Sequence, residues 1–299
     1  MTNMLSGRVA IVTGAGGGLG RAHALFLARQ GARVVVNDLT AEAAGRVVAE
    51  IEAAGGTAMA AAASVTDEAA IDAMVAEVID RWGRIDILVN NAGILRDRSF
   101  AKMSLAEFRL VVEVHLMGAA ICTKAVWEAM RGQAYGRIVM TTSSSGLYGN
   151  FGQANYGAAK MALVGLMQTL ALEGEKYGIR VNCLAPTAAT QMTEGVLSGA
   201  SLAALDPALV SPGLLALVGE EAPTRAILCA GAGHFATASV TLSQGLYLGA
   251  GDEAGAALAR DWDAVSDRTG EIVPAYGFTQ AERELASAGL GEPVMAAQR

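Results

Sequence analysis

The stretch RVAIVTGAGGGLG, residues 8–20, decides the fold. Its first half is mostly apolar, which predicts a buried strand, and the glycines that follow predict a tight turn opening a helix. In this order the backbone of the turn can approach a pyrophosphate, and the start of the helix supplies free N–H groups and a positive dipole end. The alternative is a flexible turn. The place between strand and helix favours a dinucleotide site lined by Gly14, Gly18, Leu19 and Gly20.

Short apolar runs and longer helical patterns alternate along the chain. Strands are expected at residues 8–13, 33–37, 57–62, 85–90, 137–142, 180–184 and 226–230, and helices at 19–30, 40–54, 67–82, 105–130 and 152–177. Strands joined by helical crossovers form a parallel sheet with helices on both faces, and the handedness of the crossovers makes the sheet doubly wound. We therefore predict an α/β fold with a Rossmann-like, doubly wound parallel sheet of about seven strands.

Two later stretches interrupt this alternation. Residues 186–222 form a long connection, which late in an α/β chain is typical of a lid over the substrate. Within it, Asp206 as a capping residue and Pro207 after it predict the start of a helix. Residues 250–299 hold one helical pattern, at 253–267, and then a tail punctuated by glycine and proline. We expect a dinucleotide-binding domain over residues 1–249. The remaining residues are expected to form a short helical extension, packed on the same domain or on a neighbouring subunit.

The composition excludes several classes of protein. Hydrophobic residues make up 53% of the chain and charged residues 17%, which excludes intrinsic disorder. The net charge of −7 argues against nucleic-acid partners and against an anionic membrane surface. The sequence contains no uncharged apolar run of about 18 residues, so no membrane span is predicted. Three isolated cysteines, without a signal-peptide pattern, indicate reduced thiols and a cytoplasmic location. His23 and His234 have no metal-ligand companions, so no metal site is expected.

Asp38 ends the second predicted strand. A carboxylate there can accept hydrogen bonds from both hydroxyls of an adenosine ribose and would repel a 2′-phosphate. No basic residue stands at Gly17 or Leu39, where a 2′-phosphate would need one. The alternative is that Asp38 caps the next helix, but Thr40 can do so instead. The cofactor favoured is therefore NAD rather than NADP.

Ser143, Tyr156 and Lys160 form the sharpest candidate constellation. Tyrosine and lysine four positions apart share one helix face, and a neighbouring ammonium lowers the pKa of a phenol. Tyr156 would then serve as a general acid and base for an alcohol proton, while Ser143 holds the substrate oxygen. Such a pair is usually a solvated surface contact, but Lys160 is the only charge in residues 157–172. A lone ammonium in an apolar helix needs a specific partner.

Two predicted helices are apolar around their whole circumference. Residues 157–172 carry one charge and residues 110–127 carry two. A helix on a sheet normally keeps a polar outer face, so a helix without one is covered on both sides. We therefore expect a homodimer or homotetramer assembled through the helices around 105–130 and 152–177.

The motifs together resemble the short-chain dehydrogenase/reductases. These proteins carry the turn TGxxxGxG, the tetrapeptide NNAG, and a serine followed thirteen residues later by Tyr-x-x-x-Lys; all three occur here in order. The segments GAGGGLGRA, VVVNDL, NNAGILRDRSF and YGNFGQANY are similar to the (3R)-hydroxyacyl-CoA dehydrogenase domains of the peroxisomal multifunctional enzyme type 2 group. The resemblance covers residues 6–249 and matches the 191–224 region poorly.

The resemblance implies roles for particular residues. The catalytic residues would be Ser143, Tyr156, Lys160 and His115, the last standing where many family members have asparagine. Beyond the glycine turn and Asp38, the implied cofactor-binding residues are Val65, Asn91, Ala92, Gly93, Tyr156, Lys160, Pro186 and Thr190. Arg96, Arg98 and Lys102 could meet the phosphates of a coenzyme A tail, or simply form a solvated loop.

The implied activity is hydride transfer between NAD and a secondary alcohol or ketone in lipid metabolism. The small-molecule substrate favoured is an acyl-CoA, oxidised from (R)-3-hydroxyacyl-CoA to 3-oxoacyl-CoA. One alternative is a dehydrogenase for a hydroxysteroid or another hydrophobic secondary alcohol. A second alternative is an NAD-binding sensor without catalysis, although a sensor does not need all of Ser143, Tyr156 and Lys160.

Overall fold

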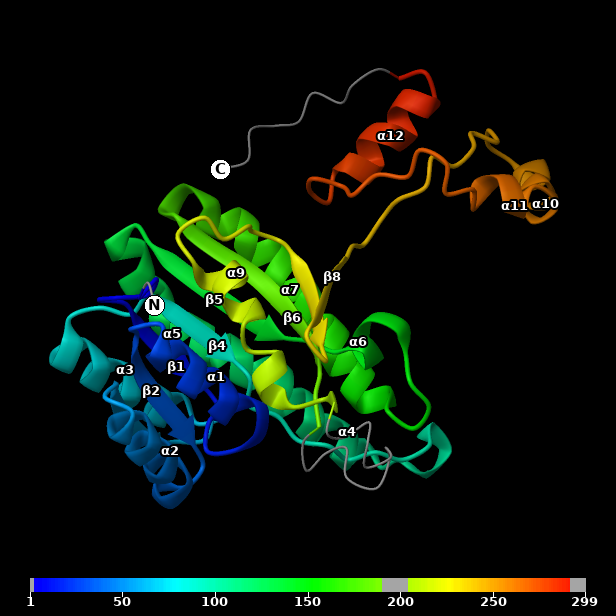
Figure 1. Ribbon diagram of the computed structural model, residues 1–299. Helices are drawn as coiled ribbons and strands as arrows, with labels where there is room; N and C mark the ends of the chain where they lie inside the picture. The colour runs from blue at the N-terminus through cyan, green and yellow to red at the C-terminus, as the bar shows by residue number, and fades with distance from the viewer. Residues whose placement is uncertain (1–2, 190–203, 291–299) are drawn as a thin grey trace. The chain divides into compact units, whose positions relative to one another are not determined.

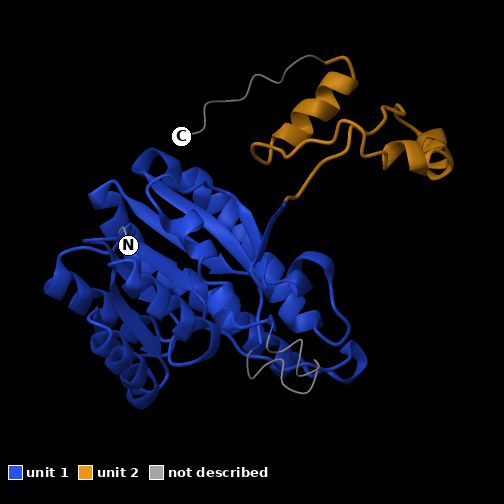
Figure 2. Ribbon diagram, in the orientation of Figure 1, with its two compact units in different colours: residues 1–238 blue, residues 239–299 orange. Residues whose placement is uncertain are grey.

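The computed structural model describes residues 3–189 and 204–290, which form two compact units. The first unit is Met1–Ala238 and the second is Ser239–Arg299 (Figure 2). The boundary lies before the one expected after residue 249. The reason is that Leu242 pairs with Ile272 and the Ser243 hydroxyl donates to the Val265 carbonyl, so residues 239–249 belong with the tail.

A single sheet forms the first unit (Figure 1). Its eight strands run in the order β3-β2-β1-β4-β5-β6-β7-β8. Their bounds are β1 Val9–Val12, β2 Arg33–Asp38, β3 Thr57–Ala62, β4 Ile87–Asn90, β5 Gly136–Thr141, β6 Ile179–Thr187, β7 Ile227–Gly231 and β8 His234–Ala238. The first seven are parallel, as predicted. The eighth was not expected: it pairs antiparallel with β7 through a two-residue hairpin, in which Ala232 and Gly233 both adopt positive φ.

Helices cover both faces of this sheet (Figure 1). The α-helices of the first unit are α1 Gly18–Arg29, α2 Ala41–Ala53, α3 Glu68–Trp82, α4 Leu105–Val112, α5 Gly118–Gln133, α6 Ser144–Tyr148, α7 Ala154–Gly174 and α9 Gly213–Val218. Buried side chains of α3, α5 and α7 form one apolar core with the strands. Those of α1, α2 and α9 form a second core on the other face. The doubly wound α/β fold is confirmed.

The region expected to form a lid is partly built into the fold. Residues 207–218, described as the 3₁₀ helix η4 (Pro207–Leu209) followed by α9, place Val210, Leu214 and Val218 in the second core. Burial of these side chains in contact with the sheet fixes the segment in place. The helical start expected at Asp206 and Pro207 is confirmed, since the Asp206 side chain caps η4 and Pro207 is its first residue. Residues 190–203 lie outside the described part of the chain.

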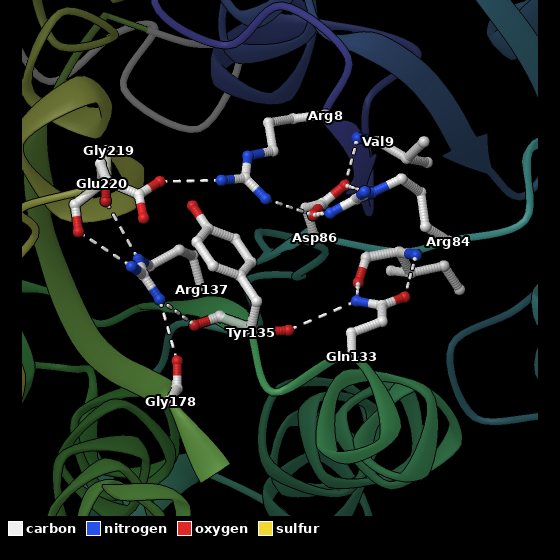
Figure 3. A network of polar contacts seen from close by, with 12 residues as sticks. Arg8, Val9, Arg84, Asp86, Gln133, Tyr135, Arg137, Gly178, Gly219 and Glu220 are labelled. Atoms are coloured by element: carbon white, nitrogen blue, oxygen red, sulfur yellow. Dashed lines mark hydrogen bonds and ion pairs between the residues drawn. The ribbon is translucent and has the colours of Figure 1, made fainter.

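A polar network closes the amino-terminal ends of the central strands (Figure 3). The buried carboxylate of Asp86 accepts hydrogen bonds from Arg8 (3.0 Å), from Arg84 (2.8 Å) and from the backbone N–H of Val9 (2.9 Å). The ring of Tyr135 lies between two guanidinium groups, 3.7 Å from Arg8 and 4.1 Å from Arg137. A buried carboxylate with several donors is satisfied rather than reactive. We therefore assign this network to stability, and look for chemistry at the opposite ends of the strands.

The predicted helix at 105–130 is one continuous helix with an irregular centre. Between α4 and α5 the five residues Glu113–Met117 form a π-helical turn, η2. Within the run Leu105–Gln133 an 18-residue window reaches a mean hydropathy of 1.5, so by length and composition the helix is apolar enough to pass for a membrane span. It packs against the sheet through Cys122, Val126 and Met130, as the core helix of a globular domain does.

Within residues 239–290, the described part of the second unit, there are three short helices joined by loops. They are α10 Asp252–Arg260, α11 Trp262–Val265 and α12 Thr279–Ser287. Several large apolar side chains in it are exposed, among them Tyr247, Trp262 and Val273. The single helix predicted at 253–267 is thus two helices, interrupted at Asp261.

Candidate active site

The glycine turn between β1 and α1 leaves no room for side chains at two positions. Gly14 adopts a φ of 61°, and a Cβ atom on it would lie 2.8 Å from Ala92 Cα. A Cβ atom on Gly20 would overlap the carbonyl oxygen of Gly14. By contrast, Gly17 faces open space, and no side chain caps the first N–H groups of α1. The turn is therefore tight on its inner side and open to an anion at the helix start.

Thr13 and Asn91 fasten this turn to the end of β4. The hydroxyl oxygen of Thr13 accepts hydrogen bonds from the backbone N–H groups of Asn91 and Ala92, each at 3.0 Å. The Asn91 side chain donates to the carbonyls of Thr13 (2.9 Å) and Gly14 (3.2 Å). β1 and β4 are the neighbours at which the strand order reverses, the crevice in which doubly wound sheets bind ligands.

Asp38 lies at the carboxyl end of β2 beside the turn. Its Oδ2 accepts from the backbone N–H of Gly16, and its Oδ1 from that of Leu39, each at 2.8 Å. Thr40 caps α2, accepting from Ala43 N, so Asp38 does not serve as the cap. Carboxylate oxygens have lone pairs to spare after one hydrogen bond each. With the open helix start, these groups fit a dinucleotide whose ribose offers free hydroxyls.

Ser143 and Tyr156 meet at the carboxyl end of β5. Ser143 begins α6, and Tyr156 lies in the first turn of α7. The Ser143 hydroxyl is buried and accepts a hydrogen bond from the backbone N–H of Ser145 at 3.2 Å. Burial raises the pKa of the Tyr156 phenol above its usual value of 10, the nearby Ser143 hydroxyl opposes that effect, and the Asp97 carboxylate adds to it. The balance favours the protonated form of Tyr156.

Lys160 is buried one helical turn after Tyr156. Its Nζ donates to the Thr141 carbonyl at 2.5 Å and lies 5.5 Å from the centroid of the Tyr156 ring. Burial lowers the pKa of the ammonium to about 7. The predicted lowering of the phenol pKa by Lys160 is therefore absent here. Both groups are desolvated, and the specific partner of the lysine is a backbone carbonyl.

His115 is placed by the π-helical turn η2. Its ring stands edge-on to the Tyr156 ring, with centroids 5.2 Å apart, and its Nε2 lies 2.8 Å from the Ile94 carbonyl oxygen. A Cβ atom on Gly93 would overlap the imidazole. Burial, with a smaller effect from Lys160, lowers the pKa of His115 to about 3. The imidazole is therefore neutral at physiological pH, packed between Gly93 and Tyr156.

A small internal cavity lies behind these groups. Its wall consists of Thr13, Val65, Asn90, Ala92, Val114, His115, Gly118, Ala119, Lys160 and Leu163. Two buried atoms of wall residues, Asn90 Oδ1 and His115 Nδ1, have no hydrogen-bond partner among the described residues.

Val65, expected beside an adenine, is buried, and a Cβ atom on Gly118 would lie 2.6 Å from its Cγ2.

The fold brings most of the predicted residues to one edge of the sheet, and adds others. Pro186 lies in β6, paired with Ala230, and the predicted Thr190 lies outside the described residues. Sequence reasoning missed Thr13, Thr141, Asp97 and Gln153. The available signal was position: Thr13 directly precedes the glycines, and Thr141 ends the strand before Ser143. The described part of the chain holds no group of three His, Cys, Asp or Glu side chains suited to a metal ion.

Comparisons with known sequences give consistent matches. A family model described as short chain dehydrogenase matches residues 8–200. Peroxisomal multifunctional enzyme A of Dictyostelium discoideum is 47% identical over 251 residues, which are 81% of this chain and 56% of that protein. Peroxisomal multifunctional enzyme type 2 of Mus musculus is 51% identical over 224 residues, 72% of this chain and 30% of that protein. The chain therefore spans about half the length of these relatives, or less.

Solved structures agree with the sequence matches. Full-length peroxisomal multifunctional enzyme type 2 from Drosophila melanogaster aligns with a TM-score of 0.79 and 39% identity, covering 96% of this chain and 50% of that one. A short chain dehydrogenase from Mycobacterium avium aligns with a TM-score of 0.78 and 38% identity, covering 92% and 99%. A 7α-hydroxysteroid dehydrogenase complexed with NADH and a 7-oxo bile acid aligns with a TM-score of 0.71 and 32% identity, covering 77% and 96%.

Proposed function

Since this chain belongs to the short-chain dehydrogenase family, we propose that it oxidises a secondary alcohol to a ketone with NAD, and catalyses the reverse reduction. The observation that carries the proposal is that the buried Ser143 hydroxyl lies close enough to the Tyr156 phenol to influence its pKa, with Lys160 buried one turn away. All three lie at the carboxyl edge of the sheet that also carries the glycine turn. A sensor without catalysis would not require a polar cluster whose burial costs stability.

Each residue has a distinct task in this proposal. Bound NAD supplies the hydride acceptor. Ser143 donates a hydrogen bond to the substrate oxygen and fixes its position, and Tyr156 takes the hydroxyl proton in oxidation or returns it in reduction. Lys160, with its pKa of about 7, can pass a proton at neutral pH. Its hydrogen bond to the Thr141 carbonyl holds the ammonium group in place. His115, neutral and packed edge-on, supports the Tyr156 ring without titrating.

The raised pKa of Tyr156 has a consequence for the direction of catalysis. A phenol that keeps its proton is ready to donate it, as reduction requires, and oxidation needs the phenolate. Oxidation is therefore expected to speed up as the pH rises, through the range where the phenol ionises. A profile that stays flat from acid to alkaline pH, with chemistry rate-limiting, would contradict Tyr156 as the proton acceptor.

We propose NAD rather than NADP because of the charge at the ribose site. Asp38 presents a carboxylate there, and the neighbouring positions Gly17 and Leu39 carry no positive charge. A 2′-phosphate would meet a like charge with no counter-ion. In the proposed site Gly14, Gly18 and Gly20 line the pyrophosphate, and Leu19 lies in the same turn. The other proposed contacts to the cofactor are Val65, Asn91, Ala92, Gly93, Tyr156, Lys160, Pro186 and Thr190.

The proposed substrate is a (3R)-3-hydroxyacyl-CoA. The names of the Dictyostelium, Drosophila and mouse relatives, peroxisomal multifunctional enzymes, support a role in lipid metabolism. A hydroxysteroid is the second candidate, supported by the 7α-hydroxysteroid dehydrogenase among the structural neighbours. Steady-state oxidation of (R)-3-hydroxybutyryl-CoA, of its S enantiomer and of a steroid panel separates the two. Tyr156→Phe is the control, and its unchanged turnover of an accepted substrate would refute the catalytic assignment.

Assembly and location form part of the proposal. Exposed apolar side chains on the two long helices, among them Leu110, Met117, Met161 and Leu172, favour a homodimer or homotetramer through these helices. We propose that the tail after Ala238 packs on its own first unit or on a neighbouring subunit. Sedimentation of the full chain and of a chain ending at Ala238 tests both points. A reducing compartment suits the free thiols of Cys122 and Cys183, and imaging of a tagged chain distinguishes cytoplasm from peroxisome.

A further inference from the structure

One amide side chain joins three segments around the proposed catalytic pair. Gln153 stands at the N-terminal end of α7, three residues before Tyr156. Its Oε1 accepts from the Ser145 hydroxyl (2.7 Å) and from Asn150 Nδ2 (3.1 Å), and its Nε2 donates to Asp97 Oδ2 (2.6 Å). Ser145 follows Ser143 by two residues, and Asp97 lies on the loop after β4. The amide thus links α6, which Ser143 begins, and the loop after β4 to α7, which carries Tyr156 and Lys160.

Two further contacts fasten the same loop to the start of α7. Asn155 Nδ2 donates to the Arg96 carbonyl at 2.9 Å, and the Arg98 N–H donates to the Gly152 carbonyl at 2.9 Å. Upstream, the backbone of Ile94 contacts the His115 imidazole. The loop 94–98 therefore follows α7 closely, and the Gln153–Asp97 bond joins the two through their side chains.

We propose that Gln153 is a positioning residue, an inference that rests on the proposed function. Its amide sets the register between Ser143 and Tyr156 and holds the Asp97 carboxylate at the start of α7, the helix that carries the phenol. Glutamine suits the task because it accepts on one side and donates on the other, and a carboxylate at position 153 could only accept. Fixing two groups in reacting geometry is worth large factors in rate, so small shifts in register are costly.

The charge of Asp97 affects the Tyr156 phenol separately from the hydrogen bond that Asp97 accepts from Gln153. Ionisable groups around Tyr156 are Lys160 on its own helix, His115 on η2, Cys183 on β6 beside Lys160, and Asp97 on the loop. Lys160 is engaged by Thr141 and His115 is neutral, which leaves Asp97 as a charge that acts directly on the phenol. It disfavours the phenolate. Because Asp97 is exposed, solvent and salt weaken this effect.

Three variants separate the hydrogen bond from the charge. Gln153→Glu keeps the acceptor for Ser145 and Asn150 but loses the donor and repels Asp97. Asp97→Asn keeps an acceptor for Gln153 and removes the charge. The double variant Asp97→Asn with Gln153→Glu restores the bond with reversed polarity, because the amide introduced at position 97 can donate to the new carboxylate. Asp72→Asn, an exposed carboxylate on α3 far along the chain from the site, is the matched control.

The expected results concern catalysis, with NAD affinity unchanged. Gln153→Glu should lower kcat/KM for (R)-3-hydroxybutyryl-CoA about tenfold, mainly in kcat, and the double variant should recover most of this loss. Asp97→Asn should move the rising limb of the oxidation profile to lower pH, so that rates there increase about threefold at low salt and less at high salt. Asp72→Asn should match the wild type.

Two results would overturn the inference. A double variant as impaired as Gln153→Glu alone would refute the positioning role. Identical pH profiles for Asp97→Asn and Asp72→Asn would refute the role of the charge. A measurement that needs no substrate tests the inference independently of the proposed function. Tyr156 is titrated by ultraviolet difference absorbance of tyrosinate, each variant being measured against the same variant carrying Tyr156→Phe. Failure of every alcohol to react would refute the proposed function, and this titration would still decide the inference.

Discussion

Replacing Lys160 by methionine is expected to abolish turnover and yet stabilise the folded chain near neutral pH. Methionine keeps the length and apolar stem of lysine without the ammonium. An unburied lysine has a pKa of 10.5, and burial lowers that of Lys160 to about 7. The difference, at about 1.36 kcal/mol for each pH unit, corresponds to about 5 kcal/mol against folding when the solution is more acidic than pH 7.

The sign follows from proton linkage. Between about pH 7 and pH 10.5 the unfolded chain holds a proton on Lys160 that the folded chain has released, so wild-type stability rises with pH in this window. Methionine removes this slope. It also leaves the Thr141 carbonyl without its donor, at a cost of about 1–3 kcal/mol. The variant should therefore be about 2–4 kcal/mol more stable near pH 6, with no advantage left near pH 10.

Urea unfolding of wild type and Lys160→Met, without NAD and at one protein concentration, measures this difference across the pH range. The decisive quantity is how the difference between the two proteins changes with pH, because other titrating groups are common to both. A variant that is less stable than wild type by the same amount at every pH would refute the reasoning. It would mean that the folded chain keeps Lys160 charged and well paired.

Three further substitutions test the rest of the site. Gly20→Ala should weaken NAD binding at least tenfold and destabilise the chain by about 1–3 kcal/mol, because the added Cβ overlaps the Gly14 carbonyl; unchanged affinity by calorimetry would argue against a tight turn. Asp38→Asn should raise the NADP/NAD ratio of kcat/KM about tenfold by removing the repelling charge; a constant ratio in initial-rate assays contradicts that role. Gly93→Ala should displace His115 and lower kcat more than it weakens NAD binding; equal losses in both would place Gly93 with the cofactor instead.

Periodicity and glycine placement were enough to predict the doubly wound sheet and its ligand crevice. The apolar run before the glycine turn became β1, and the seven predicted parallel strands all form. The eighth strand escaped prediction because β8 is largely exposed and carries no apolar pattern. Its pairing depends on the hairpin at Ala232 and Gly233, where alanine adopts an unusual positive φ.

The residues of the candidate site could be named from the sequence, but their contacts could not. The spacing of Ser143, Tyr156 and Lys160 places them on neighbouring elements, which motif and helical periodicity can reveal. The choice of Thr141 as the partner of Lys160 depends on how deeply α7 packs on β5. In the same way, the link between Gln153 and Asp97 joins residues 56 positions apart. Local patterns carry no information on contacts of that range.

The wide turn at Glu113–Met117 has a consequence for how this helix can change over time. A π-helical turn accommodates one more residue than a regular turn would, and such turns often mark functional positions. Loss of a single residue there would let the helix close into regular α-turns, and the residues after it would keep their register on the sheet. Cys122, Val126 and Met130 would therefore stay in the core. The residues of the turn itself would shift around the helix axis, so such a deletion should leave the fold intact and still move the imidazole away from the phenol.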